Sequence, residues 1–151
     1  MTLVVEKSDP RDPRATALLQ ASHALMEELF PPDTNYYLSI PELCTPDIAF
    51  FTARRENEIL GTAALADKAT YGEIKSMFVA PEARGTGAGA ALLARLEQEA
   101  RARNLPALRL ETGHSLHAAH RLYARHGFTL RGPFGDYPEG PLSLFMEKPL
   151  T

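Results

Sequence analysis

Residues 75–96, KSMFVAPEARGTGAGAALLARL, contain the pattern that decides how this chain folds. A strand-like run ends near Val79, a loop with a proline follows, and three glycines lead directly into an amphipathic helix. Glycine adopts positive φ and lets a ligand approach backbone N–H groups, and the first turn of a helix has unpaired donors and a positive dipole end. Residues 84–90 are therefore predicted to hold a phosphate or pyrophosphate, with Arg84 as a neighbouring cation.

The segments on either side of this stretch alternate between strand-like and helix-like patterns. Apolar and β-branched runs predict strands at 2–6, 48–55, 58–66, 71–79, 107–112, 128–132 and 142–148. Apolar residues at helical spacing predict helices at 15–30, 87–104 and 115–126. Residues 33–46 are expected to form a loop or a short helix. No repeat or change in composition marks a boundary, so residues 1–151 are interpreted as one domain with a mixed α/β sheet.

The composition excludes several classes of protein. The chain has 151 residues, with 16 Lys+Arg against 19 Asp+Glu and a net charge of −3. Its 44% hydrophobic and 23% charged residues are typical of soluble globular proteins and argue against a disordered or fibrous chain. A weakly acidic chain with no basic run lacks the Lys/Arg surface that binds a phosphate backbone. Nucleic acid is therefore not an expected partner.

The cysteine count and the hydropathy pattern indicate in which cellular compartment the protein is expected. Cys44 is the single cysteine, so neither an internal disulfide nor a cysteine metal cluster is expected. The first residues lack the pattern of a secretory signal, and no run of about 18 apolar residues predicts a membrane span. The expected location is the cytoplasm, without a membrane partner. The sequence does not define the oligomeric state, and a homodimer is compatible with it.

The glycine pattern has two interpretations besides anion binding. In the first, the glycines serve only a tight connection from strand to helix. In the second, GTGAGA (85–90) is a dinucleotide-binding fingerprint, G-x-G-x-x-A, with Glu111 as a ribose ligand. That fingerprint begins almost directly after its strand, whereas residues 80–84 intervene here, and too little chain follows for a second nucleotide-binding half. A Walker loop is excluded because no Lys-Ser or Lys-Thr follows the glycines.

Two motifs lie in register along the second half of the chain. VAPEARGTGAG (79–89) stands between a predicted strand and an amphipathic helix, and LYARHGF (122–128) follows downstream. Together they resemble the acetyl-CoA-binding motif R/Q-x-x-G-x-G/A and the LY-x-x-x-GF signature of the GNAT superfamily of N-acetyltransferases. The resemblance covers residues 58–148. It implies a single α/β (α+β) domain with a mixed, mostly antiparallel central sheet flanked by helices.

The resemblance also implies how acetyl-CoA, the expected cosubstrate, would bind. Its pyrophosphate is expected on the backbone of Arg84, Gly85, Thr86, Gly87, Ala88, Gly89 and Ala90. Its pantetheine arm is expected along the free edge of Met77, Phe78 and Val79. In this superfamily that strand splays away from the one predicted at 107–112, which admits the thioester, and a backbone N–H of the first strand polarises the carbonyl.

Two catalytic residues follow from the same resemblance. Glu73, six residues before Val79, is the candidate general base that deprotonates the amine, and Tyr123 is the candidate general acid for the departing thiolate. Each residue also has a structural interpretation. Glu73 fits a solvated charge at a strand end, paired with Lys75, and Tyr123 fits a core residue on the apolar face of its helix.

One position departs from the superfamily pattern. An asparagine that often contacts the pantetheine arm is replaced here by Leu116, so that contact would be absent or supplied by His114 or Ser115. His114, His117 and His120 recur every third residue, but no carboxylate partner stands out in this helix, and no metal is expected.

The turn-rich segment after Gly132 is the candidate acceptor loop, because loops often carry specificity. Phe134 and Tyr137 are predicted to face the acceptor, with Asp136 between them. A packed hairpin connection is the alternative interpretation.

The sequence thus predicts an N-acetyltransferase that moves an acetyl group from acetyl-CoA to a primary amine by direct attack. The amine belongs to an unidentified small molecule, peptide or protein. Cys44 lies outside both motifs, so no acyl-cysteine is expected. The alternatives are a non-catalytic acyl-CoA-binding or sensing module of the same fold and an NAD-dependent oxidoreductase.

Overall fold

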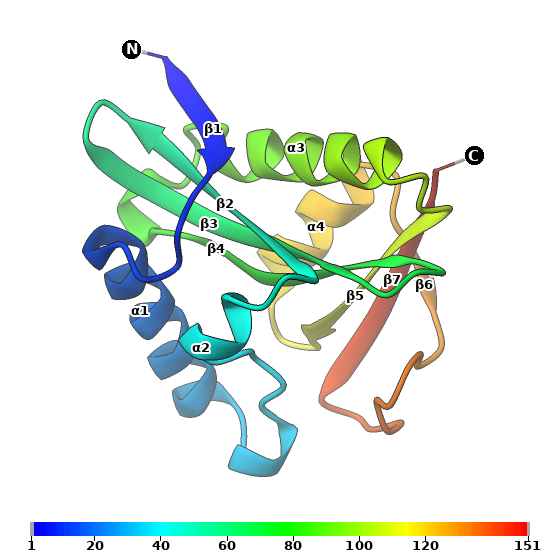
Figure 1. Cartoon of the computed structure of the whole chain (residues 1–151). Helices are drawn as coiled ribbons and strands as arrows, with labels where there is room; N and C mark the ends of the chain where they lie inside the picture. Colours follow the sequence, from blue (N-terminus) through cyan, green and yellow to red (C-terminus); the bar gives the residue numbers. More distant parts are fainter. Residues whose placement is uncertain (1, 151) are drawn as a thin grey trace.

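Seven strands form one sheet in the order β1-β2-β3-β4-β5-β7-β6 (Figure 1). The computed structural model describes residues 2–150. The strands are β1 (Leu3–Lys7), β2 (Ile48–Arg55), β3 (Glu58–Asp67), β4 (Gly72–Val79), β5 (Ala107–Gly113), β6 (Thr129–Arg131) and β7 (Ser143–Pro149). The helices are α1 (Pro13–Leu29), α2 (Ile40–Leu43), α3 (Ala88–Ala102) and α4 (His117–Arg125), with 3-10 turns η1 (Pro32–Thr34) and η2 (Pro81–Ala83). Within residues 2–150, none of the helices combines the length and the apolar character that a membrane span requires.

The pairing of the strands is mostly antiparallel, as expected. Of the six strand pairs in the part of the chain described, the pair β4–β5 alone is parallel. A dinucleotide-binding domain is built on a mostly parallel, doubly wound sheet. This topology therefore excludes the dinucleotide interpretation of the glycine motif.

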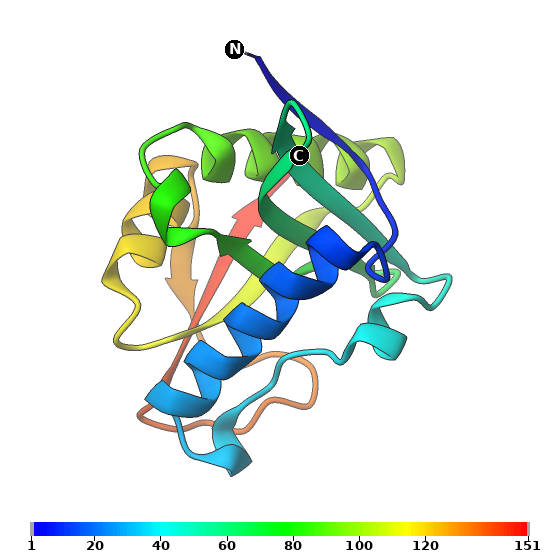
Figure 2. The ribbon, with the colours of Figure 1, turned by 90° about the vertical axis from the view of Figure 1, so that its left-hand side faces the viewer.

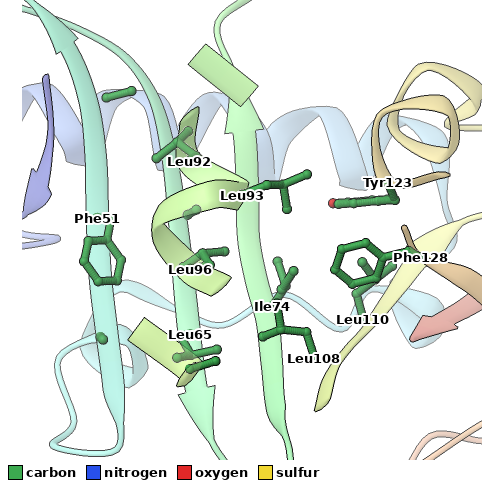
Figure 3. Packing of buried hydrophobic residues seen from close by; sticks show 14 of the residues in the cluster. Phe51, Leu65, Ile74, Leu92, Leu93, Leu96, Leu108, Leu110, Tyr123 and Phe128 are labelled. Carbon is green, nitrogen blue, oxygen red and sulfur yellow. The ribbon is translucent and has the colours of Figure 1, made fainter. Parts of the chain in front are cut away.

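Helices cover both faces of the sheet (Figures 1 and 2). On one face, Leu19 of α1 and Leu43 of α2 pack with Phe50 and Ala64 of the central strands. On the other face, α3 and α4 cover a larger core, whose members include Phe51, Leu65, Ile74, Leu92, Leu93, Leu96, Leu108, Leu110, Tyr123 and Phe128 (Figure 3). Burial of these apolar side chains is the main stabilising contribution to the fold.

Local signals in the sequence define the helix on the first face. Asp12 caps α1, because its side chain accepts a hydrogen bond from the Arg14 N–H at 2.9 Å, and Pro13 occupies the first helical position. The helix ends at Leu29, with Phe30 as its C-cap, before two prolines that cannot continue it.

Strand β4 contains one extra residue relative to β3. Lys75 pairs with Ala64 and Phe78 pairs with Thr62, so three steps in β4 oppose two in β3. Ser76 lies in this bulge with a φ of 53°, and the Thr62 hydroxyl donates to its carbonyl at 2.8 Å. A bulge bends its strand and increases the local twist. The second half of β4 is therefore redirected relative to the first half.

Strands β4 and β5 stay paired only at their beginning. Their ladder consists of Gly72 with Leu108 and Glu73 with Arg109. Beyond this point β4 continues to pair with β3, and β5 continues to pair with β7. The two strands thus diverge beyond Glu73, and their facing backbone edges have no strand partner there. We call the region between these two edges the gap, and Glu73 lies at its apex.

Candidate active site

The glycine segment forms an open turn directly before α3. Gly85 and Gly87 have φ values of 84° and 89°, and Gly87 is the N-cap residue of the helix. A Cβ atom at Gly85 would meet nothing within 4 Å, and one at Gly87 would meet only a methyl group of Leu3, at 4.0 Å. Both glycines are thus required for their left-handed backbone and not by crowding. The turn leaves space in front of its backbone.

Four backbone N–H groups in this turn are free. The N–H groups of Gly85, Gly87, Gly89 and Ala90 have no hydrogen-bond partner within residues 2–150. The other three N–H groups of residues 84–90 form long hydrogen bonds. Arg84 donates to the Pro81 carbonyl at 3.4 Å, Thr86 to the Ala83 carbonyl at 3.3 Å and Ala88 to the Thr86 hydroxyl at 3.4 Å. Together with the helix dipole, the free donors form a site suited to a pyrophosphate.

Gly89 allows α3 to approach α4 closely. A Cβ atom at this position would lie 3.1 Å from Cδ2 of Leu122 on α4, and 3.6 Å from a methyl group of Val79 on β4. The first turn of α3, the second half of β4 and α4 therefore meet at one point beside the gap. This contact gives Gly89 a packing role in addition to its free N–H.

Tyr123 lies on α4 within the core that α4 shares with α3. Its side chain is 5% exposed, its ring lies 5.7 Å from that of Phe128, and its hydroxyl is oriented toward Leu93 (Figure 3). Burial raises the pKa of Tyr123, and the charge of Glu111 adds to the rise. The phenol therefore stays protonated throughout the neutral range and can act as a hydrogen-bond donor.

Glu73 is buried and hydrogen-bonded. Its residue is 5% exposed, and its Oε2 accepts a hydrogen bond from the Tyr137 hydroxyl. The Lys75 ammonium lies 3.6 Å from the same oxygen. The pairing with Lys75 is as expected, whereas a solvated position at the strand end is wrong. A carboxylate buried at the apex of the gap has the environment of a functional group and not of a surface charge.

A cavity of about 710 Å³ opens beside Glu73 on the face covered by α1 and α2. Its lining includes the aromatic Tyr36, Tyr37, Tyr71 and Tyr137. It also includes the acidic Glu42, Asp47, Glu73 and Asp136, and two basic residues, Lys68 and Lys75. The excess of carboxylates over ammonium groups favours a cationic ligand.

The comparison with protein families agrees with this geometry. The Acetyltransferase (GNAT) family matches residues 15–128. The chain belongs to the GNAT superfamily of N-acetyltransferases. This GNAT chain is 43% identical over 150 residues, or 98% of each chain, to an IAA acetyltransferase of Azospirillum brasilense. It is 37% identical over 128 residues, 83% of this chain and 85% of the relative, to YsnE of Bacillus subtilis, an uncharacterized N-acetyltransferase. It is an acyltransferase.

Solved structures have the same fold as this GNAT chain. A candidate acyl-CoA N-acyltransferase from Klebsiella pneumoniae superposes with a TM-score of 0.83 at 34% identity and covers 99% of each chain. The PaiA N-acetyltransferase of Thermoplasma acidophilum, 17% identical over 99% of each chain, has a TM-score of 0.78 and was solved with coenzyme A. The free donors of the glycine turn and the unpaired edge of β4 fit this type of ligand. Its contacts with individual residues, including Met77, Phe78 and Val79, stay predictions.

The predicted acceptor loop of this GNAT protein divides into two parts. Tyr137 and Asp136 line the cavity. Phe134 is 5% exposed and packs edge-on against Tyr71, Tyr137 and Phe145, at centroid distances of 5.5, 5.2 and 5.8 Å. Phe134 therefore supports the cavity wall from behind. Its contact with an acceptor stays a prediction that this placement does not favour.

Two of the three histidines in and just before α4 lie close to backbone carbonyl groups. His120 Nε2 lies 2.8 Å from the Gly113 carbonyl, and His114 Nδ1 lies 3.4 Å from the Leu142 carbonyl. Leu116, in place of the usual asparagine, is the N-cap residue of α4. No group of three potential metal ligands occurs within residues 2–150.

Several residues in and near the site were not recognised from the sequence, among them Glu111, Tyr36 and Tyr37. Glu111 on β5 accepts a hydrogen bond from the Ser143 hydroxyl at 2.8 Å, and burial raises its pKa. Tyr36 and Tyr37 line the cavity from the segment between η1 and α2. The sequence did contain a signal for the two tyrosines, because two adjacent aromatic residues in a polar loop can indicate a binding surface. The sequence analysis considered Glu111 only as a possible ribose ligand, under the dinucleotide-binding interpretation that the sheet topology excludes.

Proposed function

We propose that this protein transfers an acetyl group from acetyl-CoA to a primary amine by direct attack of the amine on the thioester. The observation that carries the proposal is the position of Glu73. This buried carboxylate belongs to the last residue pair of the β4–β5 ladder and also lines the cavity of about 710 Å³. A thioester in the gap and an amine in the cavity would meet beside it.

Glu73 and Tyr123 have complementary roles in this proposal. An amine with a pKa near 10 is mostly protonated at neutral pH, so Glu73 removes a proton from the ammonium group as the nitrogen attacks. The new C–N bond forms and the C–S bond breaks. Tyr123, whose hydroxyl is protonated when the amine attacks, gives its proton to the departing sulfur and is reprotonated by the second proton that the nitrogen loses as the amide forms. Orientation of the two reactants in adjoining spaces provides a further large part of the acceleration.

The lining of the cavity supports a cationic acceptor. Its four carboxylates outnumber its two lysines, and one of those lysines, Lys75, is already hydrogen-bonded to the protein. Tyrosine faces also attract ammonium groups through cation–π interactions. An acceptor with an ammonium group and an apolar body therefore fits the cavity better than an anion does.

The test is a screen for thiol release from acetyl-CoA. The panel contains amino acids, polyamines, amine antibiotics and peptides with a free N-terminus or lysine. IAA is included because a 43% identical relative is called IAA acetyltransferase. Turnover of an amine with formation of its N-acetyl product, identified by mass spectrometry, supports the proposal.

Two other outcomes have a defined meaning. Binding of coenzyme A without turnover of any amine would favour a sensing module of the same fold. Turnover with a hydroxyl or carboxyl acceptor alone would keep the transferase and overturn the amine as its substrate.

A further inference from the structure

The Tyr137 hydroxyl stands between two charged groups of β4. It donates a hydrogen bond to Oε2 of Glu73, and it accepts one from the Lys75 ammonium at 2.8 Å. The same ammonium donates to the Tyr36 carbonyl at 2.8 Å and lies 3.6 Å from Oε2 of Glu73. The three side chains form a closed cluster in which Oε2 of Glu73 is held by both a hydroxyl and a positive charge.

Aromatic packing fixes Tyr137 in this position. Its ring contacts those of Tyr36, Phe134 and Phe145, at centroid distances of 5.2, 5.2 and 5.6 Å. Edge-to-face contacts of this kind stabilise a ring beyond the burial of its area. The ring therefore holds the hydroxyl in place, and the cluster does not depend on the flexible end of the lysine alone.

Other charged groups also lie near this carboxylate. Glu111 on β5 repels it, Arg109 is its partner in the β4–β5 ladder, and Asp136 and Lys68 line the same cavity. Lys75 is the cation that forms an ion pair with Glu73 among residues 2–150, and its charge opposes the repulsion from Glu111. Loss of a single partner of a buried charge is strongly unfavourable.

We propose that Tyr137 and Lys75 are positioning residues that hold the Glu73 carboxylate by its Oε2 atom and orient it toward the acceptor amine. This inference rests on the proposed function. Because Oε2 is engaged by Tyr137 and Lys75, the other oxygen, Oε1, is the one that takes the proton. The loop between β6 and β7 thereby positions Glu73 through the hydroxyl group of Tyr137.

The Tyr137 hydroxyl acts as a donor throughout the reaction. Burial raises the pKa of Tyr137, and the charge of Glu73 raises it further. The hydroxyl therefore keeps its own proton when Glu73 takes one from the amine. No proton passes along the cluster, so removal of the hydroxyl leaves Oε2 of Glu73 less firmly held and the carboxylate less well oriented, without interrupting a relay.

The test compares Tyr137→Phe and Lys75→Met with the unchanged protein. Tyr137→Phe removes only the hydroxyl and keeps the ring contacts. A hydrogen bond to a charged group corresponds to about tenfold in an equilibrium. We expect kcat/KM to fall about tenfold near neutral pH, and its acidic limb to move up by about one pH unit in each variant. Lys148→Met is the matched control, because Lys148 pairs with Glu97 away from the cavity.

A second readout does not depend on turnover. The side-chain carboxyl carbon of Glu73, assigned in a 13C-glutamate-enriched sample with the Glu73→Gln variant, is followed by NMR over a range of pH. We expect its titration to move to higher pH in Tyr137→Phe and Lys75→Met but not in Lys148→Met. Titration curves that coincide with that of the unchanged protein would overturn the inference. Absence of turnover in the unchanged protein would instead count against the proposed function alone.

Discussion

Glu73 and Arg109 form the last residue pair of the parallel ladder between β4 and β5. Arg109 is fixed there, because its guanidinium stacks on the Tyr71 ring at 4.5 Å and its Nε donates to Glu147 at 2.6 Å. The point at which the two strands separate is therefore held by side chains on both strands. A carboxylate at such a rigid point has the fixed geometry that a general base requires.

Replacement of Glu73 by glutamine tests the base directly. Gln keeps the size of the side chain but cannot take the proton of the ammonium group. We expect kcat/KM to fall by about 10²-fold at neutral pH. The deficit should shrink as the pH approaches that at which the free amine predominates, because a base is then no longer needed. Rates of acetyl transfer between pH 6 and pH 10 measure this.

Exposed Glu28 provides the control for this substitution. Glu28→Gln on α1 changes the net charge equally and should follow the unchanged protein at every pH. A Glu73→Gln profile parallel to that of the unchanged protein would remove Glu73 as the base.

Replacement of Gly87 by valine should weaken binding of coenzyme A at least tenfold. The φ of 89° at this N-cap position is strongly unfavourable for a β-branched residue, so the turn must rearrange and its free N–H groups lose their alignment. Calorimetric titration with coenzyme A measures the affinity. Gly140→Val is the control, because a Cβ there meets nothing within 4 Å and no positive φ is needed. Equal affinity in both variants would contradict the role of the turn.

Replacement of Tyr123 by phenylalanine separates catalysis from packing. The ring keeps its contact with Phe128, so the thermal stability and the affinity for coenzyme A should stay within error of the unchanged protein. Loss of the donor to the departing sulfur should lower kcat by about 10- to 100-fold. Single-turnover measurement of thiol release gives this rate. An unchanged kcat would leave Tyr123 as a core residue alone.

The sequence predicted the order of the elements because each has a local cause. Apolar runs predicted strands such as β2 and β3, and leucines at helical spacing predicted α3. The glycine turn was equally readable, since positive φ is required at Gly85 and Gly87. The short helix α2 also has a local signal, a capping box formed by Ser39 and Glu42.

The remaining features depend on contacts between distant residues. The bulge in β4 places a non-glycine residue, Ser76, at positive φ, and no local pattern indicates such a position. The contact between Lys75 and Tyr137 joins residues 62 positions apart and requires a particular path of the loop after β6. Phe134 depends on such contacts too, because this apolar residue of a turn-rich loop packs against Phe145 of β7, while its contact with an acceptor stays a prediction.

His23 on α1 packs against Tyr37, one of the residues that line the cavity. Its ring stacks on that of Tyr37 at 4.0 Å, and its Nε2 is buried without a hydrogen-bond partner within residues 2–150. Burial lowers the pKa of His23 below its usual value, partly opposed by Glu27. As the pH falls through about 6.5, the unfolded chain binds a proton on this residue before the folded protein does. The free energy of unfolding therefore decreases on the acidic side and is fully retained above that pH.

Replacement of His23 by phenylalanine should remove this dependence. Phe keeps the stacking on Tyr37 and abolishes the unpaired nitrogen, so the variant should be at least as stable at pH 7.5. Between pH 7.5 and pH 5.5 the free energy of unfolding, measured in urea, should fall less in His23→Phe than in the unchanged protein. His117→Gln, at an exposed position on α4, should follow the unchanged protein. If the difference between His23→Phe and the unchanged protein is the same at both pH values, His23 is not the cause of the decrease in stability on the acidic side.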